Sequence, residues 1–79
     1  MMATWKDDIV AALGALGGSA AYADIYEEVA RRRTSLPKSW RFIIRRTIQD
    51  HSSDSAGYKG REDLFVAVRG LHAGEWGLR

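Results

Sequence analysis

The segment VARRRTSLPKSWRFIIRRTIQ, residues 29–49, decides how the rest of the chain is interpreted. It carries seven basic side chains and no acidic one: Arg31, Arg32, Arg33, Lys38, Arg41, Arg45 and Arg46. Near its centre Pro37 separates two helical patterns, because proline lacks a backbone N–H and disfavours helical geometry in the residue before it. Two helices joined by a tight turn, the second of them basic, are typical of a helix-turn-helix unit. We therefore expect the second helix to contact DNA.

Outside this segment the balance of charge is reversed. Residues 1–28 hold one lysine and five carboxylates, and residues 50–79 hold four cations and five carboxylates, so the formal net charge is only +2. A basic stripe focused on one segment is the electrostatic footprint of a protein that binds a polyanion. A solvated helical face would give the same pattern, and charge alone does not separate the two interpretations.

The length of 79 residues predicts one domain, residues 1–79, with a single core. The chain has no cysteine, which excludes disulfides and thiolate metal sites. Its longest apolar run, residues 9–16, is too short for a membrane-spanning helix, and its N-terminus does not resemble a secretory signal. We expect a cytoplasmic domain.

The first two helices are predicted from periodicity and from their end signals. The first begins at Thr4, which forms a capping-box pattern with Asp7, and it ends at Gly17-Gly18. The second spans about residues 22–33, with carboxylates near its start and arginines at its end, where each sign of charge complements the helix dipole. The arginines at residues 31–33 thus have a structural role that needs no ligand.

The third helix is predicted from about Trp40 to His51, with Ser39 as its N-cap. At about 100° per residue, its two sides differ in character. The side expected to pack on the other helices collects Trp40, Ile44, Thr47, Ile48 and His51. The opposite side collects Lys38, Arg41, Phe42, Arg45, Arg46 and Gln49. Phe42 is the unusual member of this side, because a phenylalanine among arginines either packs on a neighbouring element or contacts a partner, such as a thymine methyl or a methylated base.

Beyond the third helix the pattern changes from helix to strand. Residues 52–61 are small, polar and glycine-containing, as in a loop. Residues 64–68 and 75–79 have strand-forming composition, and the glycine-rich segment 69–74 between them predicts a β-hairpin. The predicted fold class is α+β, a winged helix-turn-helix in which three helices are followed by a two-stranded β-hairpin wing. In such folds the link at residues 19–21 often supplies a brief strand.

On duplex DNA, we expect different groups of side chains to contact bases and phosphates. Base edges are usually reached near the N-terminal end of the recognition helix, where the sequence has Ser39, Trp40 and Arg41. Arg45 and Gln49 suit guanine and adenine respectively, because their forked ends match two acceptors or an acceptor and a donor. The expected phosphate contacts are Lys38, Arg46, Arg31 to Arg33, Lys59 and Arg61. Arg69 and His72 of the hairpin are expected to reach the adjacent groove or the backbone.

Three short motifs carry a family resemblance: IRRTIQDHSSDS at residues 44–55, DLF at 63–65 and GEWGLR at 74–79. They resemble winged-helix domains of bacterial and phage restriction systems, and are similar to the C-terminal domain of Dpn-type endonucleases, which cut methylated adenine sites. The positions that match in the third helix are Ile44, Arg45 and Gln49. The resemblance implies a DNA-binding module that senses base modification for a nuclease domain in cis or in trans. The nuclease domain of that family is absent from this sequence, so cleavage is not implied.

No catalytic or metal-binding pattern stands out in the sequence. His51 and His72 have no histidine four residues away and no nearby cysteine, which argues against a zinc site. Acidic pairs such as Glu62 and Asp63 could hold a metal for hydrolysis, but no lysine follows Glu62 at the spacing of a nuclease motif. We expect a domain without catalytic activity, metal or cofactor.

The alternative function is a protein-interaction module. Winged-helix domains also mediate assembly, and Phe42 with the nearby arginines would suit an acidic partner. Binding to duplex DNA that weakens as salt rises would distinguish the two, because phosphate contacts release counterions.

Overall fold

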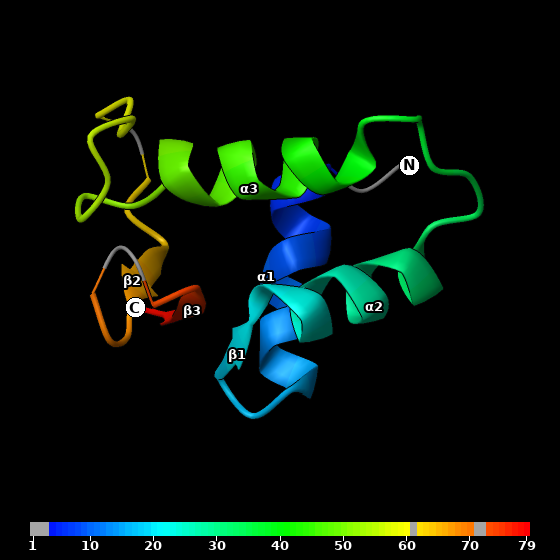
Figure 1. Cartoon of the computed structure of the whole chain (residues 1–79), viewed down its shortest axis with the longest axis horizontal. Coiled ribbons are helices and arrows are strands. Elements are labelled where there is room, and N and C mark those ends of the chain that lie inside the picture. Colours follow the sequence, from blue (N-terminus) through cyan, green and yellow to red (C-terminus); the bar gives the residue numbers. More distant parts are fainter. Residues whose placement is uncertain (1–3, 61, 71–72) are drawn as a thin grey trace.

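The computed structural model describes residues 4–60, 62–70 and 73–79, which form three helices and one three-stranded antiparallel sheet (Figure 1). In chain order the elements are α1 (Trp5–Ala15), β1 (Ser19–Ala21), α2 (Tyr22–Arg32), α3 (Trp40–Asp50), β2 (Phe65–Ala67) and β3 (Glu75–Leu78). The prediction of an α+β domain with three helices is confirmed. Within the described ranges, none of the helices has the length and apolar character needed to cross a membrane.

Helix α1 begins and ends where the sequence predicts. The hydroxyl of Thr4 accepts a hydrogen bond from the backbone N–H of Asp7 at 3.1 Å, and the carboxylate of Asp7 accepts one from the N–H of Thr4. This capping box satisfies donors that the first helical turn leaves free. At the other end Gly17 and Gly18 have φ of 91° and 103°, and the N–H of Gly18 donates to the carbonyl of Leu13 at 2.8 Å. Glycine adopts this left-handed conformation without the steric cost of a Cβ.

The sheet places β3 between β1 and β2. Trp76 of β3 is paired with Ala20 of β1 on one side and with Ala67 of β2 on the other. The predicted pairing of the last two strands is confirmed, although β2 is shorter than the run at residues 64–68. The prediction of a two-stranded hairpin was incomplete, because the link after α1 pairs with β3 as a third strand.

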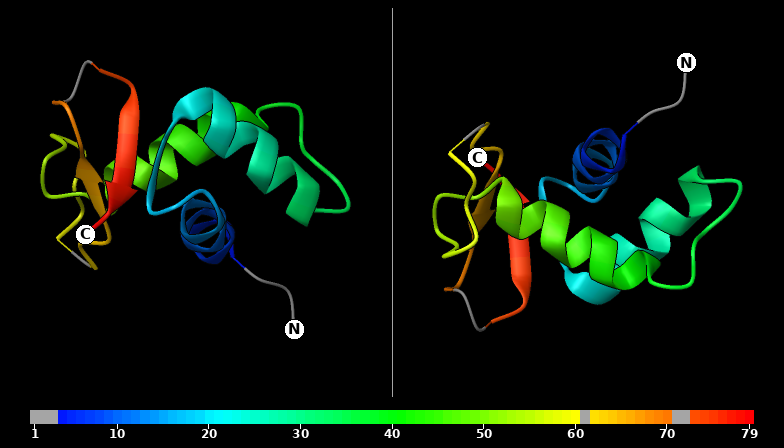
Figure 2. Two further views of the ribbon diagram at one scale, coloured as in Figure 1. Left: turned by 90° about the horizontal axis from the view of Figure 1, so that it is seen from below. Right: turned by 90° about the horizontal axis from the view of Figure 1, so that it is seen from above.

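The core lies where the three helices meet the sheet. Its fully or nearly fully buried apolar residues come from every helix and from β2 and β3: Ile9, Ala12, Leu13, Ile25, Val29, Ile44, Ile48, Phe65 and Trp76. Figure 2 shows α1 nearly end-on, crossing beside α2 and α3, with β2 and β3 at one end of the domain. Helix α3 is therefore held by α1 and α2 along one side only.

The connection between α2 and α3, residues 33–39, is longer than the tight turn that the sequence predicts. It loops out at the end of the domain away from the sheet (Figure 2). Arg33 leaves the helix with extended backbone angles, and its side chain is held by Asp8 of α1. Pro37 keeps the preceding residue out of helical geometry, and its carbonyl accepts the N–H of Trp40 at 3.1 Å as α3 begins.

The loop between α3 and β2 is fastened to the end of the sheet by Asp63 and Arg79. Asp63 accepts hydrogen bonds from the hydroxyl and the N–H of Ser53, at 2.6 and 2.9 Å, and from the guanidinium of Arg79 at 3.0 Å. The bonds from Ser53, chiefly the hydroxyl bond, and the nearby Arg79 lower the pKa of the Asp63 carboxyl. Arg79 also donates to Asp54 and to the carbonyl of Phe65.

Candidate nucleic-acid interface

Helix α3 buries one side and leaves the other in solvent, as its periodicity predicts. Ile44 and Ile48 are fully buried, whereas Arg41, Arg45 and Arg46 are exposed and 64% of Phe42 is accessible. A phenylalanine this exposed on a small domain gains nothing from water. We refer to the exposed set Lys38, Arg41, Phe42, Arg45 and Arg46 as the α3 face.

Gln49 differs from the expectation, because it is only partly exposed. The turn at Gly57 approaches it: a Cβ built on Gly57 would lie 3.9 Å from Cβ of Gln49. The loop after α3 thus covers Gln49, which lies at the C-terminal end of the side of α3 that is predicted to contact DNA. The accessible part of that side lies toward the N-terminal end of the helix.

Lys38, Arg41 and Arg45 have no acidic partner among the residues that the structure describes. Within the α3 face only Arg46 is paired, with Asp50 at a long 3.9 Å. The α3 face therefore presents positive charge that the fold itself does not neutralise.

The three arginines at the end of α2 behave differently, since each contacts a carboxylate. Arg31 pairs with Glu27 at 2.8 Å and with Glu28 at 3.4 Å, and Arg32 pairs with Glu28. The guanidinium of Arg33 bonds Asp8 and lies 3.7 Å from the ring centroid of Trp5, with its side chain only 17% exposed. Arg31 and Arg32 lie in the last turn of α2, where the predicted dipole role applies, whereas Arg33 follows the helix and its pairing with Asp8 of α1 was not predicted. Arg33 is not accessible for the phosphate contact that the sequence suggested.

A continuous row of aromatic rings runs along the junction of α2 and α3. Tyr22 lies 6.4 Å from Trp76 and stacks on Tyr26 at 5.7 Å, and Tyr26 meets Trp40 edge-on at 5.9 Å, all between ring centroids. We call Trp76, Tyr22, Tyr26 and Trp40 the aromatic row. Because Trp76 is almost fully buried, the row is anchored in the core at one end and reaches the start of α3 at the other.

Two arginines of the α3 face lie over this aromatic row. The guanidinium carbon of Arg45 is 5.1 Å from the ring centroid of Tyr22, and that of Arg41 is 4.4 Å from the ring of Trp40. Both distances are within the range of attraction between a cation and an aromatic face. Burial raises the pKa of the Tyr26 hydroxyl, and the positive charges of Arg45 and Arg41 oppose that rise.

Tyr22 and Tyr26 were not among the residues predicted from the sequence to support the exposed side of α3. The available signal was their spacing, since Tyr22 and Tyr26 are four residues apart and so lie on the same side of α2. Trp40, predicted to contact a base edge, is half-buried in the aromatic row. Ser39 is exposed at the N-cap position, although its side chain makes no capping hydrogen bond.

The remaining predicted contacts lie on the loop and the hairpin. Lys59 is exposed, and Arg69 is exposed with an ion pair to Glu75 at 3.2 Å. Arg61 and His72 lie outside the described residues. His51 is partly buried, and its Nδ1 lies 2.9 Å from the carbonyl of Thr47, as expected of a hydrogen-bonded histidine beside the core.

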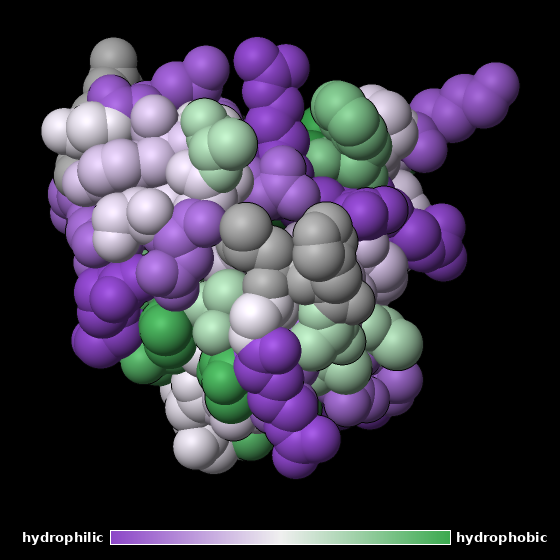
Figure 3. All heavy atoms as spheres, turned by 60° about the vertical axis from the view of Figure 1, so that its left-hand side comes forward, coloured by the Kyte–Doolittle hydropathy of each residue, from purple (hydrophilic) through white to green (hydrophobic). Residues whose placement is uncertain are grey.

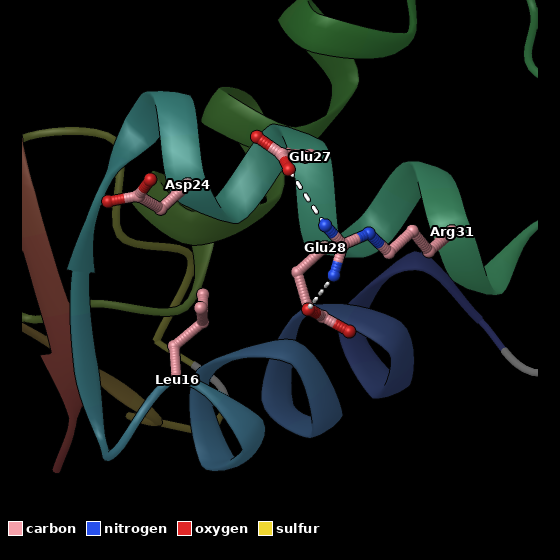
Figure 4. Close-up of a pocket in the computed structure, with 5 residues that line it drawn as sticks. All are labelled: Leu16, Asp24, Glu27, Glu28 and Arg31. Atoms are coloured by element: carbon pink, nitrogen blue, oxygen red, sulfur yellow. Dashed lines mark hydrogen bonds and ion pairs between the residues drawn. The ribbon is translucent and has the colours of Figure 1, made fainter.

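Three carboxylates of α2 lie together beside the end of α1. Asp24, Glu27, Glu28 and Arg31 of α2 line a hollow of about 80 Å³ with Leu16, and Arg31 reaches back between the two glutamates (Figure 4). Figure 3 shows mostly hydrophilic residues on the side that carries the sheet, with apolar residues in separate small areas.

Neither a family nor a metal site can be assigned to the chain. No protein-family model, curated protein or solved structure matches it. The resemblance to restriction-system domains therefore stays a prediction. Across residues 4–60, 62–70 and 73–79, the histidines and carboxylates form no group of three that could hold a metal ion.

Proposed function

We propose that this chain is a winged helix-turn-helix domain that binds double-stranded DNA through the α3 face. Three features of the fold support this arrangement: the element order α1-β1-α2-α3-β2-β3, the central place of β3 in the sheet, and a hairpin that follows α3. A helix held on one side and free on the other can enter the major groove, which is wide enough to admit it.

The observation that carries the proposal is the contrast between the paired and unpaired cations. The arginines of α2 are neutralised by carboxylates, whereas Lys38, Arg41 and Arg45 are not paired with any described acidic residue. Arg41 and Arg45 lie on the exposed side of α3, and Lys38 lies in the turn just before the helix, so a polyanion on this side would meet all three. In this proposal Arg41 and Arg45 contact base edges, while Lys38, Arg46, Lys59 and Arg69 contact phosphates.

A narrower form of the proposal concerns modified bases. The exposed ring of Phe42 lies between Arg41 and Arg45 in sequence and offers an apolar surface for a methyl group in the major groove. With the family resemblance, this supports a targeting module that senses methylated DNA for a nuclease domain in cis or in trans. Equal affinity for methylated and unmethylated duplexes of the same sequence would refute this narrower form.

The protein-interaction alternative rests on the same exposed phenylalanine. Phe42 at 64% exposure, surrounded by unpaired cations, would suit an acidic protein surface with an apolar centre. The alternative predicts no measurable affinity for duplex DNA, even at low salt. The DNA proposal predicts binding that depends on the cations of the α3 face.

A charge-matched pair of variants tests the proposal. Arg45→Ala and Arg31→Ala each remove one arginine, but Arg31 lies about two and a half turns from Tyr22 on α2 and so points away from the ring beneath Arg45. By fluorescence anisotropy with a labelled duplex, Arg45→Ala should weaken binding by about 5- to 150-fold, the range for loss of one bidentate base contact. Arg31→Ala should change it by less than about twofold, because a distant exposed charge is screened by salt. Equal losses from both variants would refute the assignment to the α3 face.

A further inference from the structure

We propose that Tyr22 and Trp40 are positioning residues that hold Arg45 and Arg41 as two preset guanine-reading groups, so that the preferred duplex has two guanines about two base-pair steps apart. This inference deepens the proposed function and rests on it. The aromatic row then positions the arginines for base recognition, and two guanines characterise the target site.

The first step concerns the arginines. A guanidinium is planar, so stacking one of its faces on a ring leaves the N–H edge free to form two parallel hydrogen bonds. Arg45 and Arg41 lie over rings at 5.1 and 4.4 Å, and neither has a described carboxylate partner that would use this edge. Arg46 of the same helix contacts Asp50 instead. Stacking thus distinguishes the two arginines from their neighbour.

The second step concerns the rings. Tyr22 is fixed by its contacts with Tyr26 and with the buried Trp76, and Trp40 is fixed by the edge contact with Tyr26. An arginine that rests on a fixed ring loses less conformational freedom when it binds, which favours both affinity and discrimination. An exposed arginine that does not rest on a ring can contact either a phosphate or a base edge, with little preference between them.

The third step concerns the spacing. Arg41 and Arg45 are four residues apart, so their Cα atoms are separated by about 6 Å along the helix axis at 1.5 Å per residue. The rise per base pair is about 3.4 Å, so the two side chains reach base pairs about two steps apart. Guanine is the base that offers two acceptors, O6 and N7, to one arginine in the major groove.

The test begins with selection of bound duplexes from a random pool by the wild-type protein. Two guanines about two steps apart should emerge, and replacing either with 7-deazaguanine, which lacks the N7 acceptor, should weaken wild-type binding by about 5- to 50-fold. Tyr22→Leu should reduce this penalty to below about threefold at one guanine and leave it unchanged at the other. Tyr22→Phe keeps the ring and should behave as the wild type.

The outcomes separate this inference from the proposed function. If the pool yields no bound duplex, the proposed function fails. If duplexes bind but Tyr22→Leu retains both penalties, or weakens every duplex equally, the positioning role of Tyr22 is wrong and DNA binding stands. If Tyr22→Leu does not fold, two measurements decide in its place. Arg45→Lys should abolish the penalty at one guanine and leave it unchanged at the other, and NMR of the unbound wild type should show ring-current shifts of the Arg45 side-chain protons that Arg46 lacks. Absence of either result would overturn the inference.

Discussion

Substituting Phe42 and Ile44 separately by alanine compares the two sides of α3 within a single turn. Ile44 is fully buried, and removing such a side chain costs about 2–5 kcal/mol through lost transfer energy and the cavity that remains. Phe42 is 64% exposed, so its substitution removes only about a third of the 1.5–3 kcal/mol that full burial of such a side chain contributes to stability, or about 0.5–1 kcal/mol. A domain of 79 residues has about 4–12 kcal/mol of total stability, so the first loss is large and the second small.

Thermal unfolding followed by far-UV circular dichroism measures both losses. At about 4–8 °C per kcal/mol for a domain of this size, Phe42→Ala should lower Tm by about 2–8 °C. Ile44→Ala should lower it by at least about 8 °C or prevent folding at room temperature. Folded Phe42→Ala should also bind duplex DNA more weakly than the wild type. A destabilisation by Phe42→Ala as large as that by Ile44→Ala would refute the assignment of the two sides.

Three further predictions concern the fold that supports α3. Thr4→Ala should destabilise the domain by about 1 kcal/mol through loss of the capping box, whereas Thr4→Ser should be nearly neutral in urea unfolding. Gly77→Ala should cost about 1–3 kcal/mol by the same measurement, because its Cβ would lie 3.1 Å from Cγ2 of Val68 and 3.2 Å from the carbonyl oxygen of Gly18. Asp63→Asn should be less stable than the wild type at neutral pH, and the difference should shrink as pH falls below the ordinary carboxyl pKa of 3.8 and vanish only below the lowered pKa of the folded state. A carboxyl whose pKa is lowered by folding stabilises only while it is ionised, so a difference that persists at low pH would contradict this account.

Local signals in the sequence were sufficient to predict the helices and their exposed sides. Thr4 with Asp7 marks the start of α1, and Gly17-Gly18 marks its end, because capping chemistry acts within one turn of the helix. The periodicity of α3 separated Ile44 from Phe42 for the same reason, since it depends only on the helical repeat. These features depend only on residues that are close together in the sequence.

Features that depend on long-range contacts were missed. Arg33 bonds Asp8 across 25 positions of the chain, a contact that no local pattern indicates. The contact of the Arg45 guanidinium with the Tyr22 ring joins two helices whose relative rotation no periodicity specifies. Gln49 was predicted to be free because the loop that covers it has no regular pattern. The residues of the predicted site could thus be identified from the sequence, whereas the aromatic rings that contact its arginines could not.

The affinity for duplex DNA as a function of salt tests the central claim most directly. The account assigns phosphate contacts to Lys38, Arg46, Lys59 and Arg69, so about four contacts should give a slope near −3.6 in log affinity against log salt, by the factor of about 0.9 per contact. Between 50 and 200 mM salt the affinity should therefore fall by about 150-fold. No binding at low salt, or an affinity that does not change across the series, would contradict the proposal that the α3 face binds DNA.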